Sequence, residues 1–150
     1  MTEHADHVLR IERTFQAPVE KVFDAWTNEE VLRRWLHANP GWETPVAEVD
    51  LRVGGAIRIV MRDPVARTDH GARGEYRQID RPHRLVFSWI FDRHPDEHQL
   101  IELEFSEREG ITTVVMTNSA IASDQQRIDQ RGGWHVCYDN LERVLANASG

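Results

Sequence analysis

Two histidines and three acidic residues fall within residues 92–98, and these side chains are ligands that zinc accepts. On a helix, the i, i+4 spacing of His94 and His98 would place both rings on one face. Pro95 lies between them, in a segment that we expect to be a hairpin loop, so the helical geometry fails. We therefore interpret the cluster as a solvated polar turn and predict no metal site.

A second pair that could do chemistry is Cys137, the single cysteine of the chain, with His135 as its base. Residues two positions apart on a helix do not face each other. Cys137 also falls on the apolar stripe of a predicted helix, where a thiol is usually packed and unreactive. Glu102 and Glu104 share the outward face of a predicted strand. We predict no catalytic residue, and His135 is the one acid–base candidate that we retain.

The five tryptophans of the chain must meet in a core or line a concavity. Strand and helix periodicity directs a set of large side chains toward one interior. These candidates for a ligand cavity are Trp42, near its mouth, and Ile59, Met61, Tyr76, Trp89, Met116, Trp134 and Tyr138. Polar side chains that could orient a ligand are Gln78, Asn118 and His135. Periodicity alone favours a filled core over such a cavity.

The first part of the chain predicts one strand and two short helices. Residues 8–16 alternate between apolar and polar side chains, which is typical of a half-buried strand. Pro18 stands where a helix would begin. Thr27 and Glu30 have capping-box spacing for a second helix, which Pro40 ends.

Six further strands and a long helix follow in the sequence. The strands are expected at residues 45–52, 56–62, 70–79, 84–91, 98–106 and 111–119. Gly54-Gly55 and Glu109-Gly110 read as turns between them. On strand 70–79, Tyr76 and Gln78 are expected on the same face. Ser123 and Gln126 have capping-box spacing and begin a helix that runs to about residue 146.

Consecutive strands with short connections form an antiparallel meander, and its apolar face must be covered. Only the C-terminal helix is long enough to cover it. Gly132-Gly133 inside this helix is expected to mark a bend or a close backbone approach. The sequence therefore predicts an α+β fold, in which a curved antiparallel sheet of six to seven strands grips one long helix and the two leave a cavity between them.

Length and charge narrow the function classes. The 150 residues suit a single domain, residues 1–150, with an ordered core at about 8–146. The formal net charge of -7 repels phosphate, so nucleic acid and anionic membranes are poor partners. We see no apolar signal region and no run near the ~20 residues of a membrane span. We expect a cytoplasmic protein without a cofactor.

Several motifs, in order, resemble the START-like superfamily (SRPBCC), which includes the polyketide cyclases and the birch-pollen allergen. Residues 13–28, RTFQAPVEKVFDAWTN, resemble the opening of its branch called activator of heat-shock-protein-90 ATPase homologues. Residues 50–55, DLRVGG, resemble that branch's D-x-R-x-G-G turn, and residues 74–89 resemble its central hairpin. Gly133-Trp134 resembles the start of its last helix. The resemblance covers about residues 8–146.

Two positions depart from the family pattern. Glu29 stands where the family often has proline, and Leu36 stands where a second aromatic residue often follows Trp35. We expect the second departure to change one wall of the cavity. The resemblance implies a helix-grip fold that encloses an apolar ligand, such as a lipid, an aromatic metabolite or a polyketide-like molecule.

The resemblance leaves three functions open. We expect binding of a small hydrophobic ligand in the cavity between the sheet and the C-terminal helix. A cyclase- or aromatase-type enzyme is the first alternative, and a buried histidine or carboxylate facing the cavity would favour it. A co-chaperone-like interaction module is the second, and a large exposed apolar patch would favour that. Whether the chain forms a homodimer stays open.

Overall fold

Seven strands and three helices make up residues 7–149, the part of the chain that the computed structural model describes. The strands are β1 (His7–Phe15), β2 (Glu43–Val49), β3 (Ala56–Asp63), β4 (Thr68–Asp80), β5 (Arg84–Phe91), β6 (Gln99–Arg108) and β7 (Ile111–Ile121). The helices are α1 (Val19–Ala25), α2 (Glu29–Trp35) and α3 (Asp124–Ser149). Expectations for residues 1–6 lie outside the described residues.

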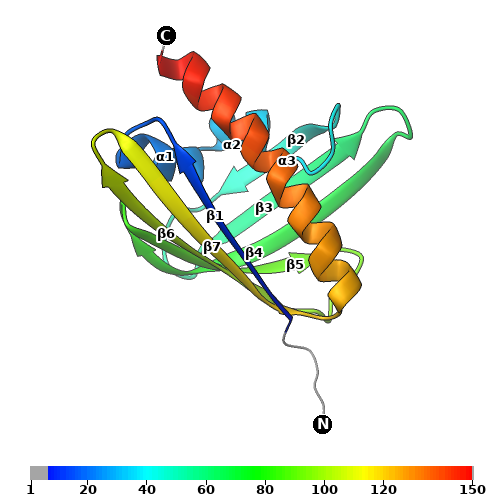
Figure 1. Ribbon diagram of the computed structural model, residues 1–150. Helices are drawn as coiled ribbons and strands as arrows, with labels where there is room; N and C mark the ends of the chain where they lie inside the picture. Colours follow the sequence, from blue (N-terminus) through cyan, green and yellow to red (C-terminus); the bar gives the residue numbers. More distant parts are fainter. Residues whose placement is uncertain (1–6, 150) are drawn as a thin grey trace.

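The strands form one antiparallel sheet in the order β1-β7-β6-β5-β4-β3-β2. Strands β2 to β7 form a meander, and β1 joins its far edge by pairing with β7. Because α1 and α2 connect β1 to β2, they carry the chain from one sheet edge to the other. The sheet is curved, and α3 runs diagonally across its open side (Figure 1). The predicted α+β helix-grip arrangement is confirmed.

The helices cover the sheet where its apolar face would otherwise meet water. Helix α1 packs against β6 and β7, α2 against β2, and α3 against β1 and α2. Phe23 of α1 meets Phe105 of β6 with ring centroids 5.3 Å apart. Trp26, just after α1, packs edge-on against Trp35 at 4.7 Å. Burial of each such ring stabilises the fold by about 1.5–3 kcal/mol.

One turn and one cap match the expectations from the sequence. Ser123 caps α3, since its Oγ accepts a hydrogen bond from the backbone N–H of Gln126 at 3.1 Å. Glu109 and Gly110 have φ of 54° and 81°, which suits a tight turn between β6 and β7. No helix within residues 7–149 has the length and apolar character needed to cross a membrane.

The predicted cap of α2 is wrong by one residue. Asn28 caps this helix, because its side-chain oxygen accepts a hydrogen bond from the N–H of Val31 at 3.1 Å. The Thr27 hydroxyl instead donates to the carbonyl oxygens of Phe23 and Asp24, 3.4 Å away in each case. Thr27 therefore belongs to the turn that follows α1 and does not cap α2.

A β-bulge on β4 explains why Gln78 does not share a face with Tyr76. Tyr76 pairs with Phe87 and Gln78 with Val86, so β4 has one more residue than β5 between these pairs. An extra residue reverses which side chains point inward. Tyr76 is buried, whereas Gln78 is exposed and accepts a hydrogen bond from Arg84 Nε at 3.2 Å.

Candidate functional site

A cavity of about 300 Å³ lies between the N-terminal half of α3, the end of β5 and the segment that follows α2. Its walls are mainly apolar, and its rim is polar. The apolar lining consists of Leu36, Ala38, Met61, Trp89, Phe91, Gly133, Trp134 and Cys137. The polar lining consists of Arg93, His94, Gln126, Asp129 and Gln130.

One face of α3 forms the roof of this cavity. The lining positions on α3 follow one another at helical spacing and therefore lie along one stripe of the helix: Gln126, Gln130, Gly133 and Cys137. Gly133 allows the helix to approach the segment after α2, because a Cβ at this position would lie 3.0 Å from Ala38 Cβ. Of the two expectations for the glycine pair, a bend or a close approach, the structure shows a close approach at Gly133.

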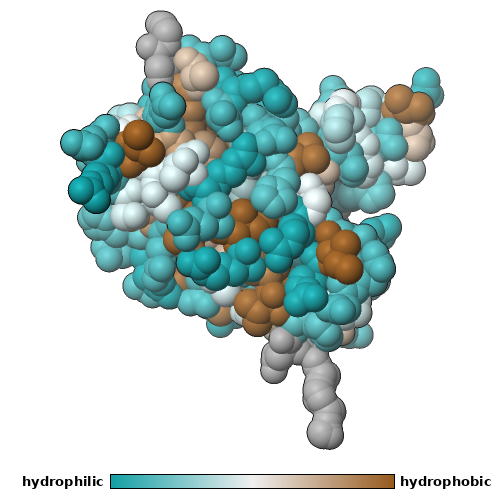
Figure 2. Space-filling view, in the orientation of Figure 1, coloured by the Kyte–Doolittle hydropathy of each residue, from teal (hydrophilic) through white to brown (hydrophobic). Residues whose placement is uncertain are grey.

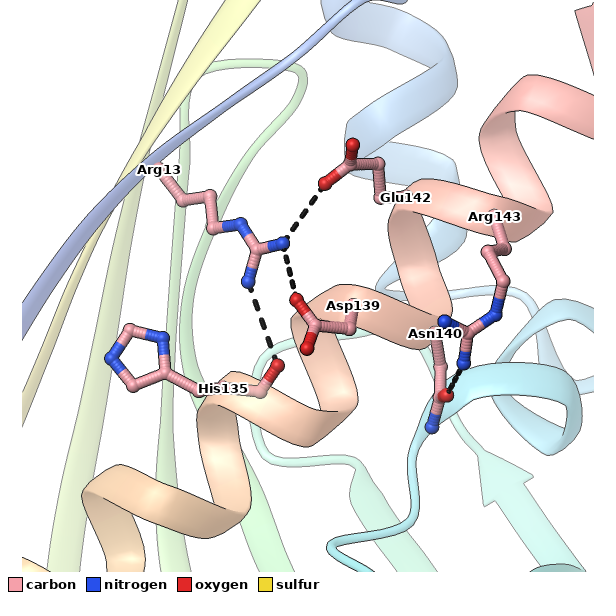
Figure 3. A network of polar contacts seen from close by, with 6 residues as sticks. All are labelled: Arg13, His135, Asp139, Asn140, Glu142 and Arg143. Carbon is pink, nitrogen blue, oxygen red and sulfur yellow. Dashed lines mark hydrogen bonds and ion pairs between the residues drawn. The ribbon is translucent and has the colours of Figure 1, made fainter. Parts of the chain in front are cut away.

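Polar contacts hold α3 beyond the cavity. Arg13 on β1 donates to the carboxylates of Asp139 and Glu142, at 2.6 and 2.9 Å (Figure 3). Asn140 donates from Nδ2 to the carbonyl oxygen of Trp35 at 3.3 Å. Arg143 donates in turn to Asn140 Oδ1 (Figure 3). The C-terminal half of α3 is thus fixed to both β1 and the end of α2.

A buried amide network lies behind the roof of the cavity. Asn118, fully buried on β7, donates to Gln99 Oε1 at 3.0 Å. Its Oδ1 accepts from Gln130 Nε2 at 2.9 Å and from Trp134 Nε1 at 3.4 Å. Gln130 also donates to Gln99 at 3.0 Å. The predicted orienter Asn118 therefore positions Gln130 and Trp134 from behind, and it is not part of the cavity lining.

Three of the predicted cavity residues line the cavity and the others do not. Met61, Trp89 and Trp134 contribute to its wall, as does Leu36, the departure from the family pattern. The residues placed elsewhere in the core, each fully buried, are Ile59, Tyr76, Met116 and Tyr138. Trp42 is half-buried and stacks on His70 with ring centroids 4.7 Å apart.

Trp26 belongs to the filled part of the interior and packs on one of those four residues, Tyr138. Its ring lies 5.8 Å from that of Trp134 and 6.0 Å from that of Tyr138, measured between centroids. Phe15 completes this cluster at 5.8 Å from Tyr138. Aromatic side chains thus fill the interior near α1, and the cavity is confined to the end of the sheet beside the β5–β6 loop.

The structure places His135 on the exposed side of α3, outside the cavity lining. Its backbone carbonyl accepts a hydrogen bond from Arg13 Nη1 at 3.5 Å, and its ring points away from this contact (Figure 3). One residue advances the helix by about 100°, which separates His135 from Trp134 on the roof. The histidine that lines the cavity is His94, which sequence reasoning assigned to a solvated turn.

Cys137 contributes its thiol to the apolar wall. Burial raises the pKa of this thiol well above its ordinary range, so the group stays protonated at neutral pH. A thiol is a weak nucleophile compared with its thiolate. The chemistry that the wall can offer is accordingly van der Waals contact and displacement of water.

Within the 92–98 segment, Asp92 and His94 have different partners. Both carboxylate oxygens of Asp92 accept hydrogen bonds from Arg58, each at 2.8 Å, and this pairing lowers the pKa of Asp92. His94 Nδ1 lies 3.7 Å from a carboxylate oxygen of Glu97. Within residues 7–149, no three histidine, cysteine or acidic side chains are grouped closely enough to hold a metal ion.

A larger groove of about 810 Å³ lies along β1 and the C-terminal half of α3. Its lining includes Glu12, Arg13 and Glu142. Arg13 and Glu142 already form an ion pair with each other, and Glu12 forms one with Arg10. This groove is more polar than the cavity beside Trp89. We therefore take the smaller, apolar cavity as the candidate site.

Sequence and structure comparisons agree with this fold. The family model described as Activator of Hsp90 ATPase homolog 1-like protein matches residues 16–146. None of the curated proteins matches the chain. A protein from Rhodobacter sphaeroides is 27% identical over 93% of each chain, with a TM-score of 0.80.

Two further solved structures are similar to this chain, and both have names that refer to AHSA1. An AHSA1-like protein from Aeromonas hydrophila is 26% identical, over 95% of this chain and 94% of that one, with a TM-score of 0.80. An AHSA1 protein from Silicibacter pomeroyi is 20% identical, over 95% and 99%, with a TM-score of 0.83. At 20% identity, the similarity to the Silicibacter pomeroyi protein shows the fold alone.

Proposed function

We propose, because the chain belongs to the Activator of Hsp90 ATPase homolog 1-like family, that it binds a small apolar molecule beneath α3. The resemblance to this family implies a helix-grip fold that encloses such a ligand. The observation that carries this proposal is the cavity of about 300 Å³ walled by Trp89, Phe91 and Trp134. Ligand pockets are typically ~300–1,000 Å³ and mainly apolar, with a few polar groups at fixed positions. The cavity matches the small end of that range.

The binding free energy would come mainly from removing apolar surface from water, at ~25 cal/mol per Å². The rigid rings of Trp89 and Trp134, whose centroids are 6.3 Å apart, lose little conformational entropy when a ligand packs on them. A cavity of this size favours a ligand of one or two fused rings, or an alkyl chain of similar volume, over a long lipid.

The two other functions implied by the resemblance have less support. His94 and Asp129 are the lining groups that could transfer protons, and both are exposed to water on the rim of the cavity. The large exposed apolar side chains include Val53, Val65 and Ile128. On the face shown in Figure 2 the hydrophobic residues are separated by hydrophilic ones, whereas a docking surface needs a contiguous patch.

Native mass spectrometry of freshly purified protein provides the first test, and we expect it to detect a co-purified small molecule. Calorimetric titration with a neutral probe, 2-naphthalenemethanol, provides the second. Leu36 is 2% exposed and lines the cavity, so Leu36→Trp should occupy the ligand's space. We expect this variant to bind the probe at least about tenfold more weakly, a loss of about 1.4 kcal/mol.

The matched control is Val65→Trp, which adds the same ring at a position that is 91% exposed. This control should bind the probe as the wild type does. Thermal unfolding of both variants establishes that each is folded. Equal affinity of Leu36→Trp and the wild type, or no binding and no co-purified molecule in the wild type, would contradict the proposal.

A further inference from the structure

We infer that the ligand of this cavity carries a carboxylate, or a comparable planar anionic group, that Arg93 binds at the rim. This inference rests on the proposed function and specifies the class of ligand: an apolar, ring-containing acid. It follows from the hydrogen-bond donors that line the cavity and from which of them already have partners.

Most nitrogen donors on the α3 side of the cavity are engaged. Gln130 Nε2 donates to Gln99 and Asn118, and Trp134 Nε1 donates to Asn118. Gln126 Nε2 donates to Glu97 Oε1 at 3.1 Å. The α3 side therefore offers a ligand oxygen few free N–H groups.

The β5 side of the cavity is different. Arg93 follows β5 directly, two positions after the wall residue Phe91, and it lines the cavity. Its guanidinium has no hydrogen bond or ion pair with any residue that the structure describes. The indole N–H of Trp89 likewise lacks a partner within residues 7–149. Arg93 and Trp89, each with a free donor, thus lie on the same side of the cavity.

Neighbouring carboxylates do not neutralise Arg93. Asp92, the adjacent residue, accepts hydrogen bonds from Nη1 and Nη2 of Arg58 and lies 3.6 Å from Arg73 Nη1. Asp129, the acidic residue of the rim, accepts a hydrogen bond from Gln125 at 3.0 Å and forms no ion pair with Arg93. Elsewhere on the sheet, Arg62 is paired with Asp69. Among the residues that the structure describes, Arg93 is therefore a cation without a partner at the mouth of an apolar cavity.

A guanidinium matches a carboxylate because it presents parallel N–H donors to two oxygens. The apolar walls strengthen this attraction, since water screens charges less beside them. The net charge of -7 repels anions at long range, so recognition of an acid must come from this local contact. A neutral apolar ligand would leave Arg93 without a function in binding.

The test compares two probes with the same ring system, 2-naphthoate and neutral 2-naphthalenemethanol, by calorimetric titration. Each is titrated into the wild type, Arg93→Gln and Arg131→Gln. Arg131 is the matched control, because it is an exposed arginine on α3 that has no partner among the described residues and does not line the cavity. Glutamine keeps a polar side chain but removes the positive charge and the parallel N–H donors of the guanidinium.

We expect Arg93→Gln to weaken 2-naphthoate binding at least about tenfold and to leave 2-naphthalenemethanol binding unchanged, whereas Arg131→Gln changes neither. If both probes bind wild type and Arg93→Gln equally, or if Arg93→Gln weakens both to the same degree, the anion-binding role is overturned while ligand binding in the cavity stands. If neither probe binds the wild type, both the proposed function and this inference are overturned.

Discussion

His37 shows at the level of a single residue how the fold tunes a side chain near the cavity. It lies half-buried after α2, and its Nδ1 is 3.0 Å from Thr44 Oγ1. Burial is the main cause that lowers the pKa of His37 below its ordinary value of 6.5, and the charge of Arg143 lowers it further. The folded protein therefore favours the neutral imidazole.

This lowered pKa predicts a pH dependence of stability. Below about pH 6.5 the unfolded chain binds a proton at His37 that the folded chain resists. The neutral His37 therefore contributes to the free energy of unfolding above that pH, and this contribution is lost as the pH falls through the lower pKa of the folded state. Between pH 7 and 5, we expect the free energy of unfolding of the wild type to fall more than that of His37→Gln, by less than about 1.4 kcal/mol per pH unit.

Chemical denaturation of both proteins across this pH range measures the difference. His83→Gln is the control, because His83 is exposed in the turn between β4 and β5, and it should follow the wild type. Parallel pH profiles for His37→Gln and the wild type would contradict the assignment of this titration to His37.

At the level of elements, the two glycines of α3 have different functions. A Cβ at Gly132 would meet nothing within 4 Å, whereas a Cβ at Gly133 would lie 3.0 Å from Ala38 Cβ. Alanine is favoured over glycine within a helix by about 0.5–1 kcal/mol. We expect Gly132→Ala to raise the free energy of unfolding by about this amount and Gly133→Ala to lower it relative to Gly132→Ala.

Thermal or urea unfolding of both variants tests this difference, and Ala38→Gly supplies its control. If contact with Ala38 is the cause, the double variant Gly133→Ala with Ala38→Gly should recover stability beyond the sum of the two single changes. A Gly133→Ala protein as stable as Gly132→Ala would contradict the close approach of α3 to this segment.

The order of elements was predictable because strand and helix periodicities are written directly into the residue pattern. The face of Gln78 was not predictable, since the bulge of β4 arises from its pairing with β5 and adds one residue without a local signal. Similarly, Thr27 has the chemistry of a cap, but its hydroxyl is used by the preceding turn.

The cavity lining was predictable in part. Trp89 and Trp134 were identified from periodicity, and extending the stripe of Trp134 and Cys137 backward along the helix would have found Gln130 and Gln126. Arg93 and His94 lie in a loop, where no period indicates direction. How far Trp26 reaches into the interior depends on tertiary packing. Its ring packs on Tyr138, one of the four predicted cavity residues that the structure places in the core.

For the molecule as a whole, the central feature is a curved sheet and a long helix that meet closely at one end and stand apart at the other. Arg13 and Asn140 fix α3 near α1 and α2, where Trp26 fills the interior. Beside the β5–β6 loop the helix leaves about 300 Å³ between aromatic walls. We propose that this end of the fold is where the ligand binds.

The most direct test follows the five tryptophan indole N–H resonances of ¹⁵N-labelled protein during addition of 2-naphthalenemethanol. Trp89 and Trp134 line the cavity, whereas Trp35 and Trp42 do not. We predict saturable shifts of the Trp89 and Trp134 resonances, with those of Trp35 and Trp42 nearly unchanged. Shifts confined to Trp42, or the absence of any shift at Trp89 and Trp134, would contradict binding beneath α3.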